Sequence, residues 1–198
     1  MLRKTKRHLN LLTTLLATLI AFPGHAMQPV EAMSEAVLKG QYAAVAEYVD
    51  DGDTFIARVN GQKFRIRLSD IDAPEVSHCK QSLASVCKRM GQPFGNEGGS
   101  FLRGAIQGKS VTIGCAGYDG RYKRNVCRVY VDGQDVNLAL VKNGLAWFYS
   151  KYSKDNTIAQ AESAARTGRL GLWSQSSPVQ PWAWRDSCWK YGECPNGI

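Results

Sequence analysis

The sequence predicts an α+β fold dominated by a small β-barrel. Residues 45–49 and 54–59 are short runs rich in β-branched and aromatic side chains, and Asn60-Gly61 after them is a strong two-residue hairpin signal. Residues 63–68 then alternate strictly, with three apolar side chains on one face and two arginines on the other. Short strands joined by a tight turn are typical of a barrel rather than of an open parallel sheet.

The rest of the chain adds two strands and about three helices to this start. We expect helices at residues 96–107, 136–143 and 157–166, and strands at 110–115 and 125–131. Gly98 and Gly99 weaken the first helix, whereas Gly144 stands where a left-handed C-cap belongs. Three strands, a helix, two strands and then helices predict a five-stranded Greek-key barrel of the OB-fold type.

The two ends of the chain have compositions that differ from the middle. Basic residues, an apolar run and small residues near position 26 predict a signal peptide at 1–26, with an uncleaved anchor helix as the alternative. We then expect an N-terminal extension at 27–42, the barrel domain at 43–174 and a Trp- and Cys-rich tail at 175–198. Tryptophans of the tail are expected to pack against the barrel, with stacking on nucleic acid bases as the alternative.

The net charge is compatible with a polyanionic partner, and the cysteine content is compatible with export. The predicted signal holds four of the 25 basic residues and none of the 17 acidic ones, so the remaining 172 residues have 21 basic against 17 acidic residues, a net charge of +4. That excess alone gives little support to binding of nucleic acid or of envelope polymers. Six cysteines in an exported chain predict three disulfides, for which neighbour pairing is our choice among 15 connectivities: Cys79–Cys87, Cys115–Cys127 and Cys188–Cys194.

Two acidic segments separated by the hairpin predict a cation site. Asp53 lies before the hairpin, in Asp-Gly-Asp-Thr at 51–54, and Asp72 follows it. A hairpin brings its two ends together, and carboxylates, carbonyls and water are the ligands that Ca²⁺ or Mg²⁺ prefers. Ordinary turn chemistry is the alternative, because Asp-Gly and Asp-x-Thr are common at turns.

Glu75, Arg67 and Arg124 complete a set that can cleave a phosphodiester. Pro74 fixes the chain just before Glu75, so a carboxylate is held three residues past Asp72, where it can take a proton from water. The two arginines can bind phosphate oxygens and stabilise the charge that builds up during in-line attack. A surface glutamate and surface salt bridges are the alternatives.

Several motifs in one order resemble the staphylococcal nuclease (thermonuclease) family. They lie at 51–54, 67–75, 119–124, 138–146 and 171–174, within a match that runs from 45 to 174. The resemblance implies an oligonucleotide-binding barrel with Ca²⁺-dependent phosphodiesterase activity on DNA and RNA and 3′-phosphate products. It also implies that Asp53, Asp72 and the carbonyl of Ala73 bind Ca²⁺. Arg67, Glu75 and Arg124 are the implied catalytic set.

The chain departs from the family pattern at the second arginine. The family usually has glycine before it, whereas Lys123 precedes Arg124 here. Arg121 is therefore a rival candidate for phosphate binding, although the spacing to the following strand favours Arg124.

Two further departures concern the rim of the site. The loop after Glu75 is longer than in the best-known member and contains Cys79 and Cys87. Of two tyrosines that border the family's nucleotide pocket, Tyr152 matches one position and Ser150 occupies the other.

The sequence therefore predicts an exported, Ca²⁺-dependent nuclease for DNA and/or RNA, secreted or periplasmic and monomeric, with no stable membrane insertion after signal cleavage. The alternative is a non-catalytic nucleic-acid-binding OB-fold module. Such a module has no need for two aspartates, a glutamate and two arginines in register, so the complete set favours catalysis.

Overall fold

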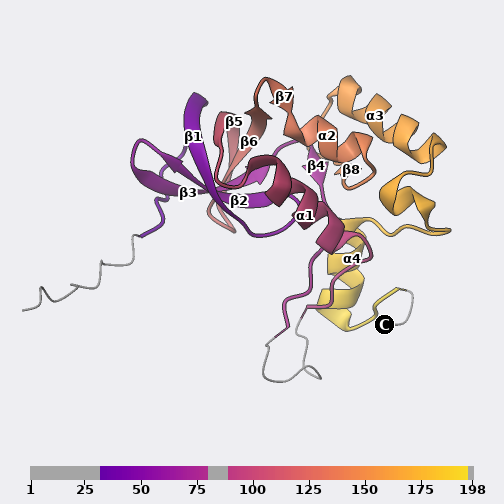
Figure 1. The fold of residues 1–198 in the computed structure, drawn as a ribbon. Helices are drawn as coiled ribbons and strands as arrows, with labels where there is room; N and C mark the ends of the chain where they lie inside the picture. The colour runs from indigo at the N-terminus through magenta and orange to yellow at the C-terminus, as the bar shows by residue number, and fades with distance from the viewer. Residues whose placement is uncertain (1–31, 80–88, 196–198) are drawn as a thin grey trace, which may run out of the picture. The chain divides into compact units, whose positions relative to one another are not determined.

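The computed structural model describes residues 32–79 and 89–195 (Figure 1). The predicted signal peptide at 1–26 lies outside the described residues. Within the described ranges, every helix is too short or too polar to cross a lipid bilayer.

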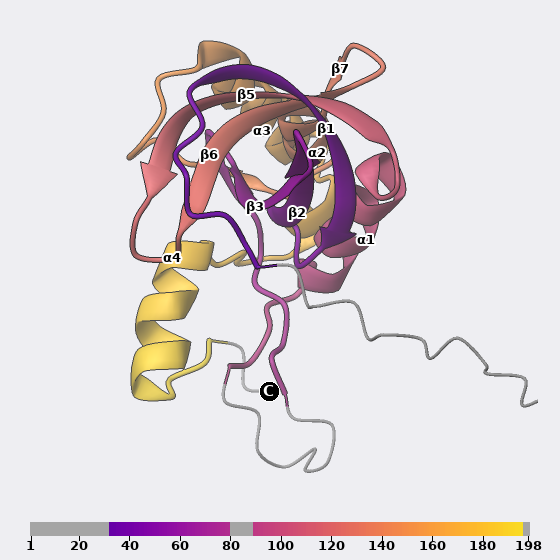
Figure 2. The ribbon, with the colours of Figure 1, turned by 90° about the vertical axis from the view of Figure 1, so that its left-hand side faces the viewer.

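Five strands of the described chain form a closed, mixed barrel, as the sequence predicts: β1 (Gly40–Val49), β2 (Thr54–Val59), β3 (Gln62–Leu68), β5 (Ser110–Asp119) and β6 (Arg124–Val131). Antiparallel neighbours follow the order β3-β2-β1-β5-β6, and a parallel pairing of β3 with β6 closes the barrel. Figure 2 shows these strands curving together. Short strands β4 (Ile71–Asp72) and β8 (Trp147–Phe148) pair with each other, and β7 (Gln134–Asp135) pairs with β6.

The β2–β3 hairpin forms where the sequence places it. Asn60 and Gly61 have φ of 48° and 82°, the left-handed conformation that a tight two-residue hairpin turn requires. Phe64 and Ile66 on β3 are buried in the core, and Arg65 points to solvent. Arg67 departs from the expected polar face, because it is 9% exposed. The alternation of buried and exposed side chains along β3 therefore ends at Arg67.

The described helices are α1 (Gly95–Ile106), α2 (Val136–Lys142), α3 (Asn156–Thr167), the 3₁₀ turn η1 (Gly171–Ser174), α4 (Pro181–Trp184) and the π-helical turn η2 (Arg185–Trp189). α1 forms despite Gly98 and Gly99, which lower the helix propensity of this segment. A Cβ on Gly98 would lie 3.2 Å from the carbonyl oxygen of Leu145 and 3.7 Å from the Cα of Gly52. Glycine is therefore used here for close approach of α1 to the loop before β2.

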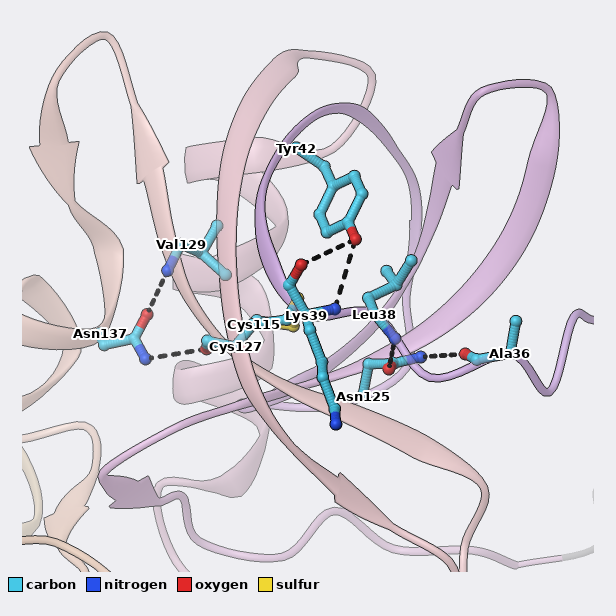
Figure 3. Close-up of a disulfide and its surroundings, with 9 residues drawn as sticks. All are labelled: Ala36, Leu38, Lys39, Tyr42, Cys115, Asn125, Cys127, Val129 and Asn137. Atoms are coloured by element: carbon cyan, nitrogen blue, oxygen red, sulfur yellow. Dashed lines mark hydrogen bonds between the residues drawn. A yellow bond between two sulfur atoms is a disulfide. The ribbon is translucent and has the colours of Figure 1, made fainter.

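Two of the three expected disulfides lie in the described chain. Cys115–Cys127 joins directly paired residues of β5 and β6, and Cys188–Cys194 closes a loop in the tail. The third expected pair includes Cys87, which lies outside the described residues. Figure 3 shows the β5–β6 disulfide with Asn125, whose Oδ1 accepts a 2.7 Å hydrogen bond from the amide of Leu38. The strand that begins with Arg124 is thus fixed on both sides.

The C-terminal tail packs on the barrel domain through its tryptophans. Trp184 is completely buried, and its indole Nε1 donates to the carbonyl of Met90 over 2.9 Å. Trp182 stacks on Tyr149 with ring centroids 5.0 Å apart and an interplanar angle of 5°. α4, at the yellow end of the ribbon, consequently lies beside the loop that leads into α1 (Figures 1 and 2).

Candidate active site

The hairpin brings the two acidic segments together, as predicted. Thr54, the first residue of β2, pairs with Arg67 near the end of β3, and the amide of Leu68 donates to the carbonyl of Asp53 over 2.8 Å. Asp53 and Arg67 therefore stand side by side at one end of the barrel. β4 then returns Asp72 to the same place, held by pairing with Trp147 of β8.

Arg67 bridges the two aspartates. Its Nη1 lies 2.9 Å from Oδ2 of Asp53, and its Nη2 lies 2.7 Å from Oδ1 of Asp72. Oδ2 of Asp53 also accepts a 2.8 Å hydrogen bond from the amide of Ala73. The three charged side chains are 10% exposed or less, so these charge-assisted bonds form in a poorly solvated place where they are strong.

The backbone amide and carbonyl of Glu75 are both hydrogen-bonded to Gln92. Its amide donates to Oε1 of Gln92 over 3.0 Å, and its carbonyl accepts from the amide of Gln92 over 2.7 Å. A Cβ on Gly95 would lie 2.2 Å from the carbonyl oxygen of Glu75, so the first residue of α1 packs directly on this peptide. The side chain of Glu75 is 13% exposed and faces Asp72.

Arg124, at the start of β6, reaches the same end of the barrel. Its Nη2 pairs with Asp119 at 2.7 Å, and its Nη1 lies 3.3 Å from the hydroxyl of Thr54. Its Nε is buried and has no hydrogen-bond partner within the described chain. Lys123 before it has φ of 53°, the left-handed conformation that the family's glycine would adopt easily. The bulkier residue is therefore accommodated, and Arg124 keeps its place.

The two weaker substrate-binding candidates stand at the periphery. Arg121 is exposed, and its guanidinium carbon lies 5.4 Å from the ring centroid of Tyr122. Tyr152 is 70% exposed and meets Tyr149 edge to face, with centroids 4.8 Å apart. The structure thus brings together Asp53, Asp72, Glu75, Arg67 and Arg124, and leaves Arg121 and Tyr152 outside this cluster.

Sequence reasoning missed Arg185, which the tail brings to the same carboxylates. Its Nη2 lies 2.7 Å from Oδ2 of Asp72, and its Nη1 lies 3.2 Å from Oδ1 of Asp72 and 2.5 Å from Oε1 of Glu75. Arg185 is 110 residues from Glu75 along the chain. No local pattern marks it, since a single arginine after Trp-Ala-Trp looks like any surface cation.

Carboxylates outnumber guanidinium groups in the innermost cluster. Burial and then the neighbouring Asp53 carboxylate raise the pKa of Asp51 to about 8. Burial raises the pKa of Glu75 to about 7, against the opposing effect of Arg185, and burial likewise raises the pKa of Asp72. Burial therefore disfavours the ionised form of these acidic groups more than the neighbouring guanidinium groups favour it.

A divalent cation fits the chemistry of this donor set. Four acidic side chains (Asp51, Asp53, Asp72 and Glu75) lie close to two guanidinium groups, Arg67 and Arg185. Oxygen ligands of this kind suit a hard ion such as Ca²⁺. Within the described ranges, no three acidic, His or Cys side chains converge in the arrangement of a metal site. Oδ2 of Asp53 and both carboxylate oxygens of Asp72 are bonded to guanidinium groups.

Comparison with known proteins shows the family to which the chain belongs. A model of the family described as "Staphylococcal nuclease homologue" matches residues 65–175. An uncharacterized endonuclease of Haemophilus influenzae is 36% identical over 138 residues, which cover 69% of each chain. A micrococcal nuclease of Shigella flexneri is 35% identical over 146 residues, which cover 68% of this chain and 75% of that one.

A plant relative extends the likeness beyond bacteria. The staphylococcal-like nuclease CAN1 of Arabidopsis thaliana is 38% identical over 127 residues, which cover 64% of this chain and 35% of the relative. The chain thus spans about a third of that protein's length. Given the matched residues 65–175 and the relatives that align over two thirds of the chain, the protein belongs to the staphylococcal nuclease family of phosphodiester-cleaving hydrolases.

Proposed function

We propose that this protein is an exported, Ca²⁺-dependent nuclease that hydrolyses DNA and/or RNA and leaves 3′-phosphate ends. The observation that carries the proposal is the convergence of Asp53, Arg67, Asp72 and Glu75 on one end of the barrel, within hydrogen-bonding distance of one another or of a shared partner. Export is supported by the N-terminal sequence pattern and by the disulfides, which persist in oxidising compartments.

Each residue of the cluster has a role that its position supports. Asp53, Asp72 and the carbonyl of Ala73 would hold the cation. When bound, Ca²⁺ supplies positive charge that neutralises the phosphate oxygens. Arg67 and Arg124 donate hydrogen bonds to those oxygens and stabilise the charge of the transition state.

Glu75 acts as the general base. It takes a proton from water, whose oxygen then attacks phosphorus in line with the departing 5′ oxygen. The P–O5′ bond breaks, the departing oxygen gains a proton, and the products are a 5′-hydroxyl and a 3′-phosphate. A pKa of Glu75 near 7 in the structure suits a group that must both accept and release a proton at neutral pH.

The test uses purified protein with its disulfides intact. Plasmid DNA and RNA are incubated with the protein in Ca²⁺ or in EGTA. A polymerase cannot extend a 3′-phosphate end, so DNA products that are extended only after phosphatase treatment carry a 3′-phosphate. We expect cleavage only with Ca²⁺, and 3′-phosphate ends. Folded protein that retards DNA on a gel in Ca²⁺ without cutting it would contradict the proposal and favour the binding module.

A further inference from the structure

The tail arginine occupies the carboxylates that the proposed function assigns to the cation. The side chain of Asp72 is 1% exposed, and it offers a ligand two carboxylate oxygens. Oδ1 is shared by Arg67 and Arg185, and Oδ2 is bonded to Arg185 at 2.7 Å. The same guanidinium also covers Oε1 of Glu75.

The segment that carries Arg185 is anchored on the barrel domain, so the contact of Arg185 with Asp72 does not depend on its side chain alone. Arg185 directly follows Trp184, which is buried and bonded to the carbonyl of Met90. Trp189, four residues further on, donates to the same carbonyl over 2.8 Å. Gln92, which holds the peptide of Glu75, also donates to the carbonyl of Val179 before α4. The loop that positions Glu75 and the segment that carries Arg185 are thus fixed to each other.

Charge and distance make Arg185 and a divalent cation competitors. Ca²⁺ binds carboxylate oxygens at about 2.3–2.6 Å, so an ion on Oδ2 of Asp72 would compete for that oxygen with Nη2 of Arg185, which lies 2.7 Å from it. Two cations that close in a poorly solvated site repel each other strongly. Of the two arginines on Asp72, Arg67 is 10% exposed and is also paired with Asp53, whereas the side chain of Arg185 is 30% exposed. Arg185 is therefore the one with a path into solvent.

We propose that Arg185 sets the cation affinity of the site: it serves as a tethered counter-cation for Asp72 and Glu75, and an entering divalent ion displaces it. This inference rests on the proposed function, because it takes Asp72 as a cation ligand. Displacement also uncovers Glu75, so the base becomes accessible only when the cation is bound. The tail thereby couples cation binding to exposure of the base.

Equilibrium Ca²⁺ binding by calorimetry, without nucleic acid, tests the inference in the full mature chain. Arg185→Gln removes the competing charge, Arg185→Lys keeps it, and Arg103→Gln makes the same charge change at an exposed position of α1. We expect Arg185→Gln to bind Ca²⁺ about ten-fold more tightly than wild type. Arg185→Lys should stay near wild type, and Arg103→Gln should match it.

The outcomes separate the inference from the proposed function. Equal or weaker Ca²⁺ binding by Arg185→Gln, with its circular dichroism unchanged, would overturn the displacement of Arg185 and leave the nuclease assignment standing. Absence of Ca²⁺ binding by all four proteins would overturn both the calcium dependence and this inference.

A second readout in the wild-type protein does not depend on a variant's folding. The Nε–H NMR signal of Arg185, assigned by its absence from Arg185→Lys, should shift as Ca²⁺ saturates the site. A signal that stays in place through saturation would show that the guanidinium remains on Asp72, and the inference would fail.

Discussion

Arg67 and Asp72 form an ion pair of 2.7 Å between side chains that are 10% and 1% exposed. The same guanidinium also pairs with Asp53 at 2.9 Å. Arg67 is thus both a donor for a phosphate and the counter-charge that allows two aspartates to be buried. This double role means that its removal should affect folding as well as catalysis.

Replacing Arg67 with alanine should lower the free energy of unfolding by about 3 kcal/mol in the absence of Ca²⁺, because the buried Asp53 loses its guanidinium partner and the buried Asp72 keeps only Arg185. Arg65→Ala is the matched control, since Arg65 lies on the same strand, is 46% exposed and pairs with Asp50 at 3.3 Å. Its change should stay below about 1 kcal/mol. Urea unfolding followed by circular dichroism measures both, and equal losses would contradict the structural role of Arg67.

Arg124 and Arg121 should differ sharply in their effect on cleavage. Arg124 has a buried, unpartnered Nε and lies within 3.3 Å of Thr54, whereas Arg121 is exposed. We expect Arg124→Ala to reduce kcat about 100- to 1,000-fold, the usual effect of losing a donor to transition-state charge. Arg121→Ala should stay within a few-fold of wild type. Steady-state kinetics on one oligonucleotide measure kcat of both variants. A large loss for Arg121→Ala and a small one for Arg124→Ala would show that Arg121 is the second phosphate-binding arginine.

Two glycines of α1 differ in their contact with Glu75: Gly95 packs against its peptide, and Gly104 does not. A Cβ on Gly95 would lie 2.2 Å from the carbonyl oxygen of Glu75, whereas a Cβ on Gly104 meets nothing within 4 Å. Gly95→Ala should therefore displace the Glu75 peptide and lower both kcat and thermal stability. Gly104→Ala should raise the free energy of unfolding by up to about 1 kcal/mol through helix propensity and leave kcat unchanged. Unchanged activity of a folded Gly95→Ala protein would disprove the importance of this contact.

The stability of the domain should fall on acidification partly through Asp155. Its hydrogen bond from Arg128 lowers its pKa below the usual value of 3.8, and its side chain also caps α3. A carboxylate whose pKa is lowered in the folded state contributes stability above its unfolded pKa and loses it as pH falls through the folded pKa. The contribution is therefore present at neutral pH and lost below about pH 4.

Asp155→Asn should consequently be less stable than wild type at pH 7, and the gap should narrow at pH 3. Asp132→Asn, an exposed aspartate in the β6–β7 turn, controls for the change in net charge. Denaturant unfolding at the two pH values provides the comparison. A gap between wild type and Asp155→Asn that is the same at pH 7 and pH 3 would show that ionisation of Asp155 contributes nothing.

Much of the barrel and of the site could be predicted because their signals are local. Asn60-Gly61 favours a tight hairpin because both residues readily adopt a left-handed backbone, and the register of that hairpin places Asp53 beside Arg67. Asp72 and Glu75 follow within eight residues of Arg67. Arg124 could be placed from its spacing to the β6 strand, and the left-handed Lys123 keeps it there.

Other features depend on contacts that leave no local pattern. The two-residue strands β4 and β8 are too short to show periodicity, although their pairing fixes Asp72. α1 begins at Gly95, one residue before the Asn-Glu start signal, at the point where Gly95 packs against the Glu75 peptide. Arg185 reaches the site only through the burial of tryptophans far along the chain, so its position could not be read from neighbouring residues.

The most direct measurement of the central claim is the rate of plasmid cleavage in saturating Ca²⁺ by wild type, Glu75→Gln and Glu97→Gln. Glu97 is exposed in the first turn of α1 and serves as the control for the same substitution. The account predicts that Glu75→Gln lowers the rate by at least about 100-fold while its thermal unfolding remains cooperative, and that Glu97→Gln cleaves like wild type. Full activity of Glu75→Gln would contradict the site on which the account rests.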